Sequence, residues 1–187
     1  MATPAQWQEQ IEQVCARVGI QQVDLLLDQS AWNNSAVPAL KILKPPVPWF
    51  SLFSGTPEEN LLDQAPLLMR LDLSHWQHKA WLEELLTHCA ADARLLVLIS
   101  PLPFEVLSHA LQALSQIKWG GQGGLLRYYD PRIFPLLMTS ILTASSAPNT
   151  CRWPVTGAGW TGTISHSGCK AIARQSRPAS SSAPAWT

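Results

Sequence analysis

The stretch RLLVLISPLPFEVLSHALQAL, residues 94–114, contains an aliphatic run followed directly by a helical pattern. The five consecutive aliphatic residues 95–99 are typical of a strand that is buried on both faces, as happens when helices cover a largely parallel sheet. Pro103 is suited to open a helix, because the first helical residue does not need an amide hydrogen. The apolar residues that follow at helical spacing are Phe104, Leu107, Leu111, Leu114 and Ile117. We therefore predict a helix packed on a buried strand.

The residues upstream of this unit show the same alternation of strand and helix patterns. Short apolar runs at 23–27, 48–53 and 67–71 predict strands, and brief helices are expected at 36–43 and after Thr56. The alternation predicts an α/β domain with a central mixed or largely parallel sheet and helices packed on it.

Two longer helices in this region begin with a recognisable capping pattern. Thr3–Gln6 is a capping box with proline at the first helical position, and Gly19 is suited to end that helix. Ser74–Gln77 is a second capping box. The apolar residues that follow it at helical spacing are Trp81, Leu82, Leu85, Leu86 and Cys89.

Downstream, LLRYYDPRIFPLL, residues 125–137, holds both tyrosines of the chain. We predict a strand over Leu125–Tyr129, in which Tyr128 and Tyr129 point to opposite faces. Asp130 is suited to cap a following helix and Pro131 to occupy its first position, so a structural role is sufficient for both. The expected buried side of that helix is Ile133, Phe134, Leu137, Met138 and Ile141.

The character of the chain changes at about residue 143. All 13 Asp and Glu lie at or before Asp130, and the last leucine is Leu142. Residues 144–187 are rich in Ser, Thr, Ala, Gly and Pro and show no sustained period, which predicts a disordered tail behind an α/β domain at 1–143. Two hypotheses account for this tail: it is a natural basic segment, or it is a translation of the correct DNA in a shifted frame. The nucleotide sequence of these codons would decide between them.

Composition excludes several classes of function. With 13 basic and 13 acidic side chains, the chain has no overall field that would attract nucleic acid or an anionic membrane. The N-terminal residues lack the apolar core of a secretory signal, and no run is long enough to span a bilayer, so we expect a cytoplasmic protein. The four cysteines form no C-x-x-C pair and are expected to be reduced and buried. They are Cys15, Cys89, Cys151 and Cys169.

Patterns that would carry catalysis or bind a cofactor are weak. His75 and His78 offer at most a zinc half-site, because His88 and Cys89 lie at the far end of the same predicted helix. GGQGG at 120–124 follows a helix and precedes a strand, the reverse of a phosphate-binding loop, so a flexible connection is expected. We predict no catalytic residues, no metal and no cofactor.

Tryptophan is unusually frequent, with nine residues in the chain. Trp32 lies in a polar loop and Trp119 stands beside the glycines, and neither belongs to an apolar stripe. Exposed indoles favour protein contacts, because tryptophan is enriched among interface anchors. The alternative is that these rings cover the core or a crowded loop.

At residues 127–132 the sequence reads RYYDPR, and this hexapeptide closes a series of blocks that resembles a known bacterial family. The blocks are VDLLLDQSA, PWFSLFSGTPEENLLDQAPLLMRLD, RLLVLISPLPFEVLSHALQAL and LLRYYDPRIFPLLMTSIL. Together they resemble the domain of unknown function 4123 over roughly residues 20–143. Proteins of this kind continue past the hexapeptide with a charged helical stretch, from which this chain departs.

The resemblance implies an adaptor chaperone of the type VI secretion system, which binds an effector protein and helps load it onto the VgrG spike protein without catalysing a reaction. On this interpretation the candidates for partner contact are Arg127, Tyr129, Arg132, Trp32 and Trp119, and the structural part of the signature is Tyr128, Asp130 and Pro131. Arg127 could equally pair with Asp130 within the chain.

Two other interpretations stay open. One is a small α/β enzyme, hydrolase-like or nucleotide-binding, with polar groups converging at the strand ends. The other is a truncated product that is partly non-functional.

Overall fold

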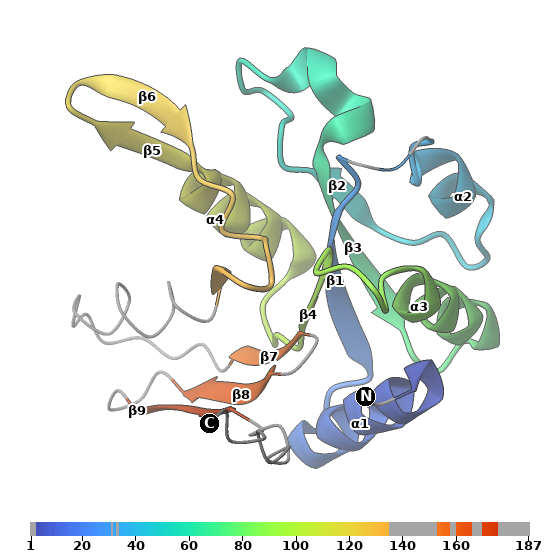
Figure 1. Cartoon of the computed structure of the whole chain (residues 1–187). Coiled ribbons are helices and arrows are strands. Elements are labelled where there is room, and N and C mark those ends of the chain that lie inside the picture. The colour runs from blue at the N-terminus through green and yellow to red at the C-terminus, as the bar shows by residue number, and fades with distance from the viewer. Residues whose placement is uncertain are drawn as a thin grey trace, which may run out of the picture.

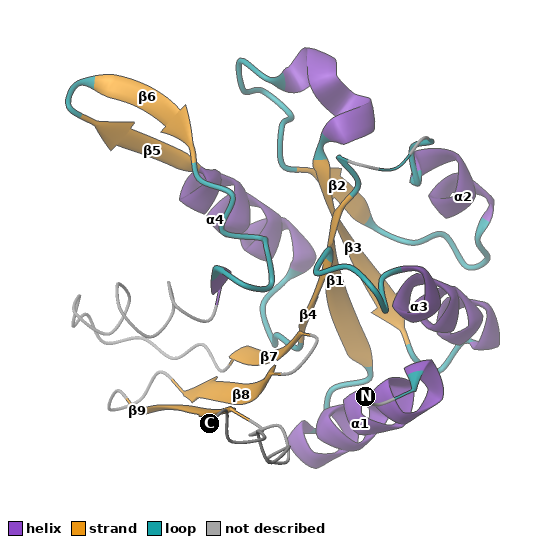
Figure 2. Cartoon of the chain, viewed as in Figure 1, coloured by secondary structure: helices purple, strands orange, loops and turns teal. Residues whose placement is uncertain are grey.

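Figure 1 shows the computed structural model of the chain, which describes residues 3–30, 32 and 34–134 and three further strands at 153–157, 160–165 and 170–175. The helices are α1 (Pro4–Val18), α2 (Val37–Ile42), α3 (Trp76–His88), α4 (Phe104–Ser115) and the short 3-10 helix η1 (Glu59–Gln64). The strands are β1 (Gln22–Asp28), β2 (Trp49–Ser51), β3 (Pro66–Asp72), β4 (Leu95–Leu98), β5 (Gln116–Trp119), β6 (Gln122–Leu125), β7 (Trp153–Gly157), β8 (Trp160–Ser165) and β9 (Lys170–Gln175). Helices and strands alternate from α1 to α4, as the sequence predicts, and the two strands β5 and β6 follow in succession (Figure 2).

The main sheet is antiparallel, and the prediction of a mixed or largely parallel sheet is wrong. Its strand order is β2-β3-β1-β4-β7-β8-β9, and each neighbouring pair runs antiparallel. The physical reason is the position of β1. Because β1 pairs antiparallel with both β3 and β4, those two strands point the same way, and α3 connects them across the intervening strand. The local strand–helix–strand pattern was therefore identified correctly, but its strands are not neighbours.

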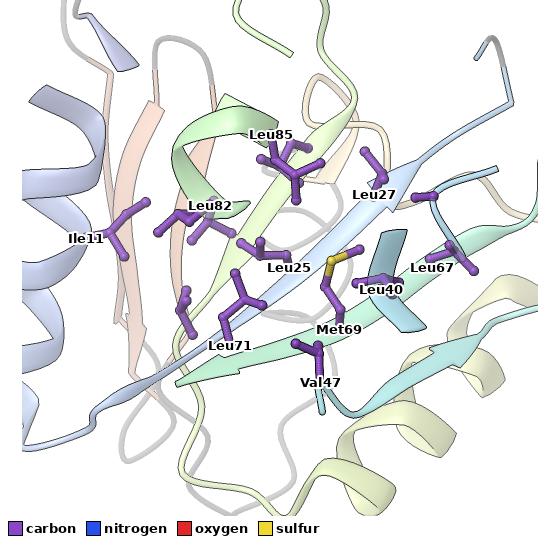
Figure 3. Packing of buried hydrophobic residues seen from close by; sticks show 14 of the residues in the cluster. Ile11, Leu25, Leu27, Leu40, Val47, Leu67, Met69, Leu71, Leu82 and Leu85 are labelled. Carbon is purple, nitrogen blue, oxygen red and sulfur yellow. The ribbon is translucent and has the colours of Figure 1, made fainter. Parts of the chain in front are cut away.

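Both faces of the sheet are buried at β1, β3 and β4, which explains the uninterrupted aliphatic run at 95–99. One face packs against α1, α2 and α3 (Figure 3). The residues labelled in the figure come from three helices and two strands, together with one residue just before β2. They are Ile11 of α1, Leu40 of α2, Leu82 and Leu85 of α3, Leu25 and Leu27 of β1, Leu67, Met69 and Leu71 of β3, and Val47 before β2. Cys15 and Cys89 are buried free thiols in this cluster, as expected, and burial raises the pKa of each to about 11.

The opposite face packs against α4 and the segment that contains the two tyrosines. Its core consists of Leu26, Leu52, Leu68, Leu96, Leu98, Leu107, Leu111, Tyr128, Tyr129 and Phe134. Because side chains alternate along a strand, Asp24 and Asp28 of β1 share this face with Leu26. This face therefore combines an apolar core with buried carboxylates.

The ends of α1 and α3 differ in how well the sequence predicts them. At α1 the capping box is confirmed, with Thr3 and Gln6 bonded reciprocally and Gly19 in the left-handed conformation. The second capping box is wrong. The Ser74 hydroxyl donates to the Asp72 carboxylate instead, and α3 begins without a side-chain cap.

The glycines after α4 form a hairpin, which Figure 1 shows extending from the end of that helix. Gly120 and Gly121 have φ of 57° and 81°, the left-handed values that a two-residue hairpin turn requires. The expected flexible connection is thus a turn between β5 and β6. Ile117, expected on the helix seam, lies on β5 and is exposed, because α4 ends at Ser115.

Three segments of the stretch 144–187, which composition predicts to be disordered, are strands that extend the sheet beyond β4. Val97 and Leu98 of β4 pair with β7, so the otherwise unpaired edge of β4 accounts for this position. The proposed boundary at residue 143 lies outside the described residues, as do Cys151 and Cys169. The shifted reading frame stays a prediction.

No helix in the described part of the chain is long and apolar enough to cross a membrane.

Candidate functional site

The signature segment 127–132 is a turn that follows β6, and the predicted strand over 125–129 is wrong. Tyr128 and Tyr129 do not point to opposite faces but join the same core cluster. Their rings make an edge-to-face contact with centroids 5.7 Å apart. Two adjacent residues can enter one core only if the chain leaves the extended conformation, since neighbours in a strand point apart.

Tyr128 connects the turn to α4. Its side chain is fully buried, and its hydroxyl donates a hydrogen bond of 2.7 Å to the Leu111 carbonyl oxygen. The ring also packs beside Phe134. Burial raises the pKa of the Tyr128 hydroxyl, so this group stays a hydrogen-bond donor. The structural role predicted for Tyr128 agrees with this position.

Arg127 connects the same turn to β1. One of its guanidinium nitrogens, Nη2, lies 2.6 Å from Oδ2 of Asp28, which is only 6% exposed. The Arg127 side chain itself is 54% exposed and packs against the Tyr129 ring, with 5.9 Å between the guanidinium carbon and the ring centroid. The hydrogen bond from Arg127 to Asp28 raises the pKa of Arg127, while burial and the nearby Asp28 charge raise the pKa of Tyr129. Arg127 therefore pairs with Asp28 and not with Asp130.

Asp130 caps the next helical turn, as the sequence predicts. Its backbone carbonyl accepts from the Phe134 amide at 2.9 Å, and its Oδ1 accepts from the Arg132 amide at 2.9 Å. The Arg132 side chain adds a fork of hydrogen bonds to both carboxylate oxygens, which holds the pKa of Asp130 below its usual range. Residues 135–141 of the predicted helix lie outside the described residues. Phe134 is buried as expected, but Ile133 is exposed.

A second ion pair on the same face of the sheet was missed by sequence reasoning. Asp24 of β1 lies directly opposite Arg70 of β3, and the two form a bidentate pair with distances of 2.7 and 2.8 Å. Asp24 is 1% exposed and Arg70 is 11% exposed. Burial raises the pKa of Asp24, and the bonds from Arg70 offset part of that shift. The guanidinium of Arg70 also lies over the Phe104 ring at 5.7 Å.

A signal for these pairs was present in VDLLLD, residues 23–28. Residues separated by two or four positions in a strand share one face, so Asp24 and Asp28 had to lie together with Leu26. Buried carboxylates require cationic or hydrogen-bonding partners. The two aspartates were instead interpreted as the ends of an apolar run.

The other residues predicted for partner contact are placed differently. Tyr129 is buried, so its side chain stabilises the turn and is not available on the surface for partner contact. Trp32 is half-buried beside the first core cluster, with its ring 6.4 Å from that of His88. This matches the alternative that the indole covers the core. The side chain of Trp119 lies outside the described residues.

Of the two histidines that offered at most a zinc half-site, His78 is engaged within the chain. His78 is buried, its Nδ1 accepts from the Asp72 amide at 3.0 Å, and its Nε2 lies 2.8 Å from the Pro45 carbonyl oxygen. Both ring nitrogens are therefore occupied within the chain, with the proton on Nε2. His75 packs edge-to-face against this ring.

Comparison with protein families matches residues 25–147 to a model described as Domain of unknown function (DUF4123). The match includes Asp28 and the complete RYYDPR turn, and it begins one residue after Asp24. The chain belongs to this family. No curated protein and no solved structure matches the chain. For this DUF4123 domain, the turn at 127–132 is a joint that connects β1, α4 and the following helical turn.

Proposed function

We propose that this DUF4123 protein is a cytoplasmic adaptor chaperone that binds a type VI secretion effector and helps load it onto the VgrG spike protein. Its action is binding and release, with no chemical step. The family membership supports the proposal, because the RYYDPR hexapeptide and the blocks before it resemble those of such adaptors.

The observation that carries the proposal is the difference in exposure between the tyrosines and the arginines of the hexapeptide. Tyr128 and Tyr129 are buried and hold the turn, whereas the side chains of Arg127 and Arg132 are 54% and 78% exposed. Asp130 orients the guanidinium of Arg132 through a fork of hydrogen bonds, and Asp28 accepts one hydrogen bond from Arg127. The remaining N–H groups of each arginine can donate to carbonyl or carboxylate oxygens of a partner without a large loss of side-chain entropy.

The test is co-purification with the proteins encoded by the neighbouring genes. A tagged chain is co-expressed with a candidate effector and, separately, with the spike protein, and the affinity of each complex is measured with purified components. We expect a retained effector at micromolar concentration. A chain that is folded and retains neither protein at that concentration contradicts the adaptor function.

A matched pair of variants examines the role of the signature. Arg132→Ala removes an exposed guanidinium of the hexapeptide, and Arg17→Ala removes one on the exposed surface of α1. We expect Arg132→Ala to weaken effector binding about tenfold, which corresponds to about 1.4 kcal/mol, and Arg17→Ala to leave it unchanged. Equal affinities for the two variants would remove the signature from the contact surface.

A further inference from the structure

The loop between β2 and β3 holds η1, the turquoise coil beside β2 in Figure 1. Its position is set by backbone contacts. The buried Gln29 side chain donates from Nε2 to the Leu62 carbonyl oxygen at 2.9 Å, and the Ala65 amide donates to the same oxygen at 3.2 Å. The coil is therefore anchored to the domain through main-chain atoms.

Although the backbone of η1 is bonded to the domain, its leucine side chains are exposed to solvent. Leu61 and Leu62 are 49% and 40% exposed, and neither belongs to a core cluster. The two leucines follow each other in the chain on an anchored element, and each leaves a large part of its surface outside the two core clusters. Two adjacent exposed leucines make a small apolar face that a partner can cover.

Carboxylates surround this apolar face. Glu58 and Glu59 precede the two leucines in the sequence, and Asp63 follows them directly. Residues 45–69 include no Lys, Arg or His. One oxygen of Glu58, Oε2, is buried and has no hydrogen-bond partner within the described part of the chain. Glu59 and Asp63 are exposed, so their carboxylates are available to cationic groups of a partner.

We propose that the acidic leucine face, defined as Glu58, Glu59, Leu61, Leu62 and Asp63, docks a segment of the effector in which apolar residues are flanked by Lys or Arg. This inference rests on the proposed adaptor function and names the chemistry of its partner. Charge complementarity selects the occupant, because an acidic segment would be repelled by three carboxylates. The apolar side chains of the segment cover the leucines, and its cationic groups face the exposed carboxylates of Glu59 and Asp63.

The experiment compares two charge reversals of equal size. Glu59→Lys with Asp63→Lys changes the proposed face, and Glu83→Lys with Glu84→Lys changes two exposed residues on α3. Effector binding is measured by titration calorimetry at low and high salt. We expect the first double variant to lose at least tenfold in affinity and most of the salt dependence, and the second to stay within about threefold.

A third variant examines the apolar part of the face. Leu61→Ser with Leu62→Ser leaves the backbone anchor to Gln29 in place, so the thermal midpoint should change little while effector affinity falls. An unchanged affinity in this variant and in the η1 charge reversal, with a wild-type chain that binds the effector, overturns the docking face and leaves the adaptor function standing.

A probe that needs no effector separates the two failures. A synthetic peptide with alternating Leu and Lys is titrated into the isotopically labelled chain, and the same peptide with Glu in place of Lys serves as control. We expect the Lys peptide to shift amide signals of residues 56–64 and the Glu peptide to leave them unchanged. Shifts that occur elsewhere, or that are the same for both peptides, contradict the proposal even if no effector is retained.

Discussion

Replacing Arg70 by methionine tests whether the buried pair on the α4 face stabilises the fold. Methionine keeps most of the volume of the arginine stem but removes both hydrogen bonds to Asp24, which are 2.7 and 2.8 Å long. Asp24 is 1% exposed, so its carboxylate would be left in the interior without a partner. Breaking a buried pair in this way costs about 3–5 kcal/mol, a large part of the roughly 5–15 kcal/mol that stabilises a domain.

The assay is urea unfolding followed by tryptophan fluorescence at pH 7. With a denaturant slope of about 2 kcal/mol per molar urea, the midpoint of Arg70→Met should fall by about 1.5–2.5 M. The difference from the wild type should narrow as the pH falls towards 4. Burial raises the pKa of Asp24, and loss of Arg70 raises it further, so protonation favours the folded variant and its stability is lost as the pH rises through the folded-state pKa.

The double variant Asp24→Leu with Arg70→Met is the matched control. It removes both charges and fills the site with apolar groups, which is often neutral or stabilising relative to the intact pair. We expect it to be more stable than Arg70→Met alone. A single variant within about 0.5 kcal/mol of the wild type, a value typical of surface substitutions, would refute the reasoning. A double variant as unstable as the single one would do the same.

Three further predictions concern the Tyr128 hydrogen bond, the Asp130 helix cap and the two buried thiols. Tyr128→Phe removes the 2.7 Å hydrogen bond to the α4 backbone and should lower the free energy of unfolding by about 0.5–1.5 kcal/mol in the same urea assay. An unchanged free energy would contradict a stabilising role for this hydrogen bond. Asp130→Ala removes a helix cap and should cost about 0.5–2 kcal/mol at pH 7. Because Arg132 lowers the pKa of Asp130, this contribution is present above the unfolded-state pKa and is lost as the pH falls through the folded-state pKa, so wild type and variant should converge in acid. Cys15 and Cys89, with pKa values of about 11, should react with iodoacetamide at pH 8 far more slowly in the native chain than in urea, and equal rates would contradict their burial.

Local chemistry was the most predictable part of this chain. The capping box at Thr3–Gln6, the aliphatic run at 95–99 and the cap at Asp130 depend on neighbours within a few residues, and each appears as predicted. The cap predicted at Ser74–Gln77 failed because Asp72, just outside the motif, accepts the serine hydroxyl. The strand predicted at 125–129 failed because both tyrosines are drawn into one core cluster.

The candidate site depended on contacts between distant residues. The hexapeptide itself could be located from sequence, but Arg127 pairs with Asp28 across 99 positions, and Tyr128 bonds a backbone oxygen of α4. Arg70 and Asp24 are 46 positions apart and meet only because β1 and β3 are in register. Strand spacing could have predicted that Asp24 and Asp28 share a face, but not which cations approach them.

The amino-acid sequence by itself determined the order of helices and strands from α1 to α4, the burial of strand β4 on both faces and the membership of the signature turn in its family. The tertiary structure decided the direction and order of the strands and the partner of each buried charge. The physical reason is the sequence separation of the interacting residues. Periodicity and capping depend on residues a few positions apart, whereas the placement of β1 between β3 and β4 depends on packing both faces of the sheet against distant helices.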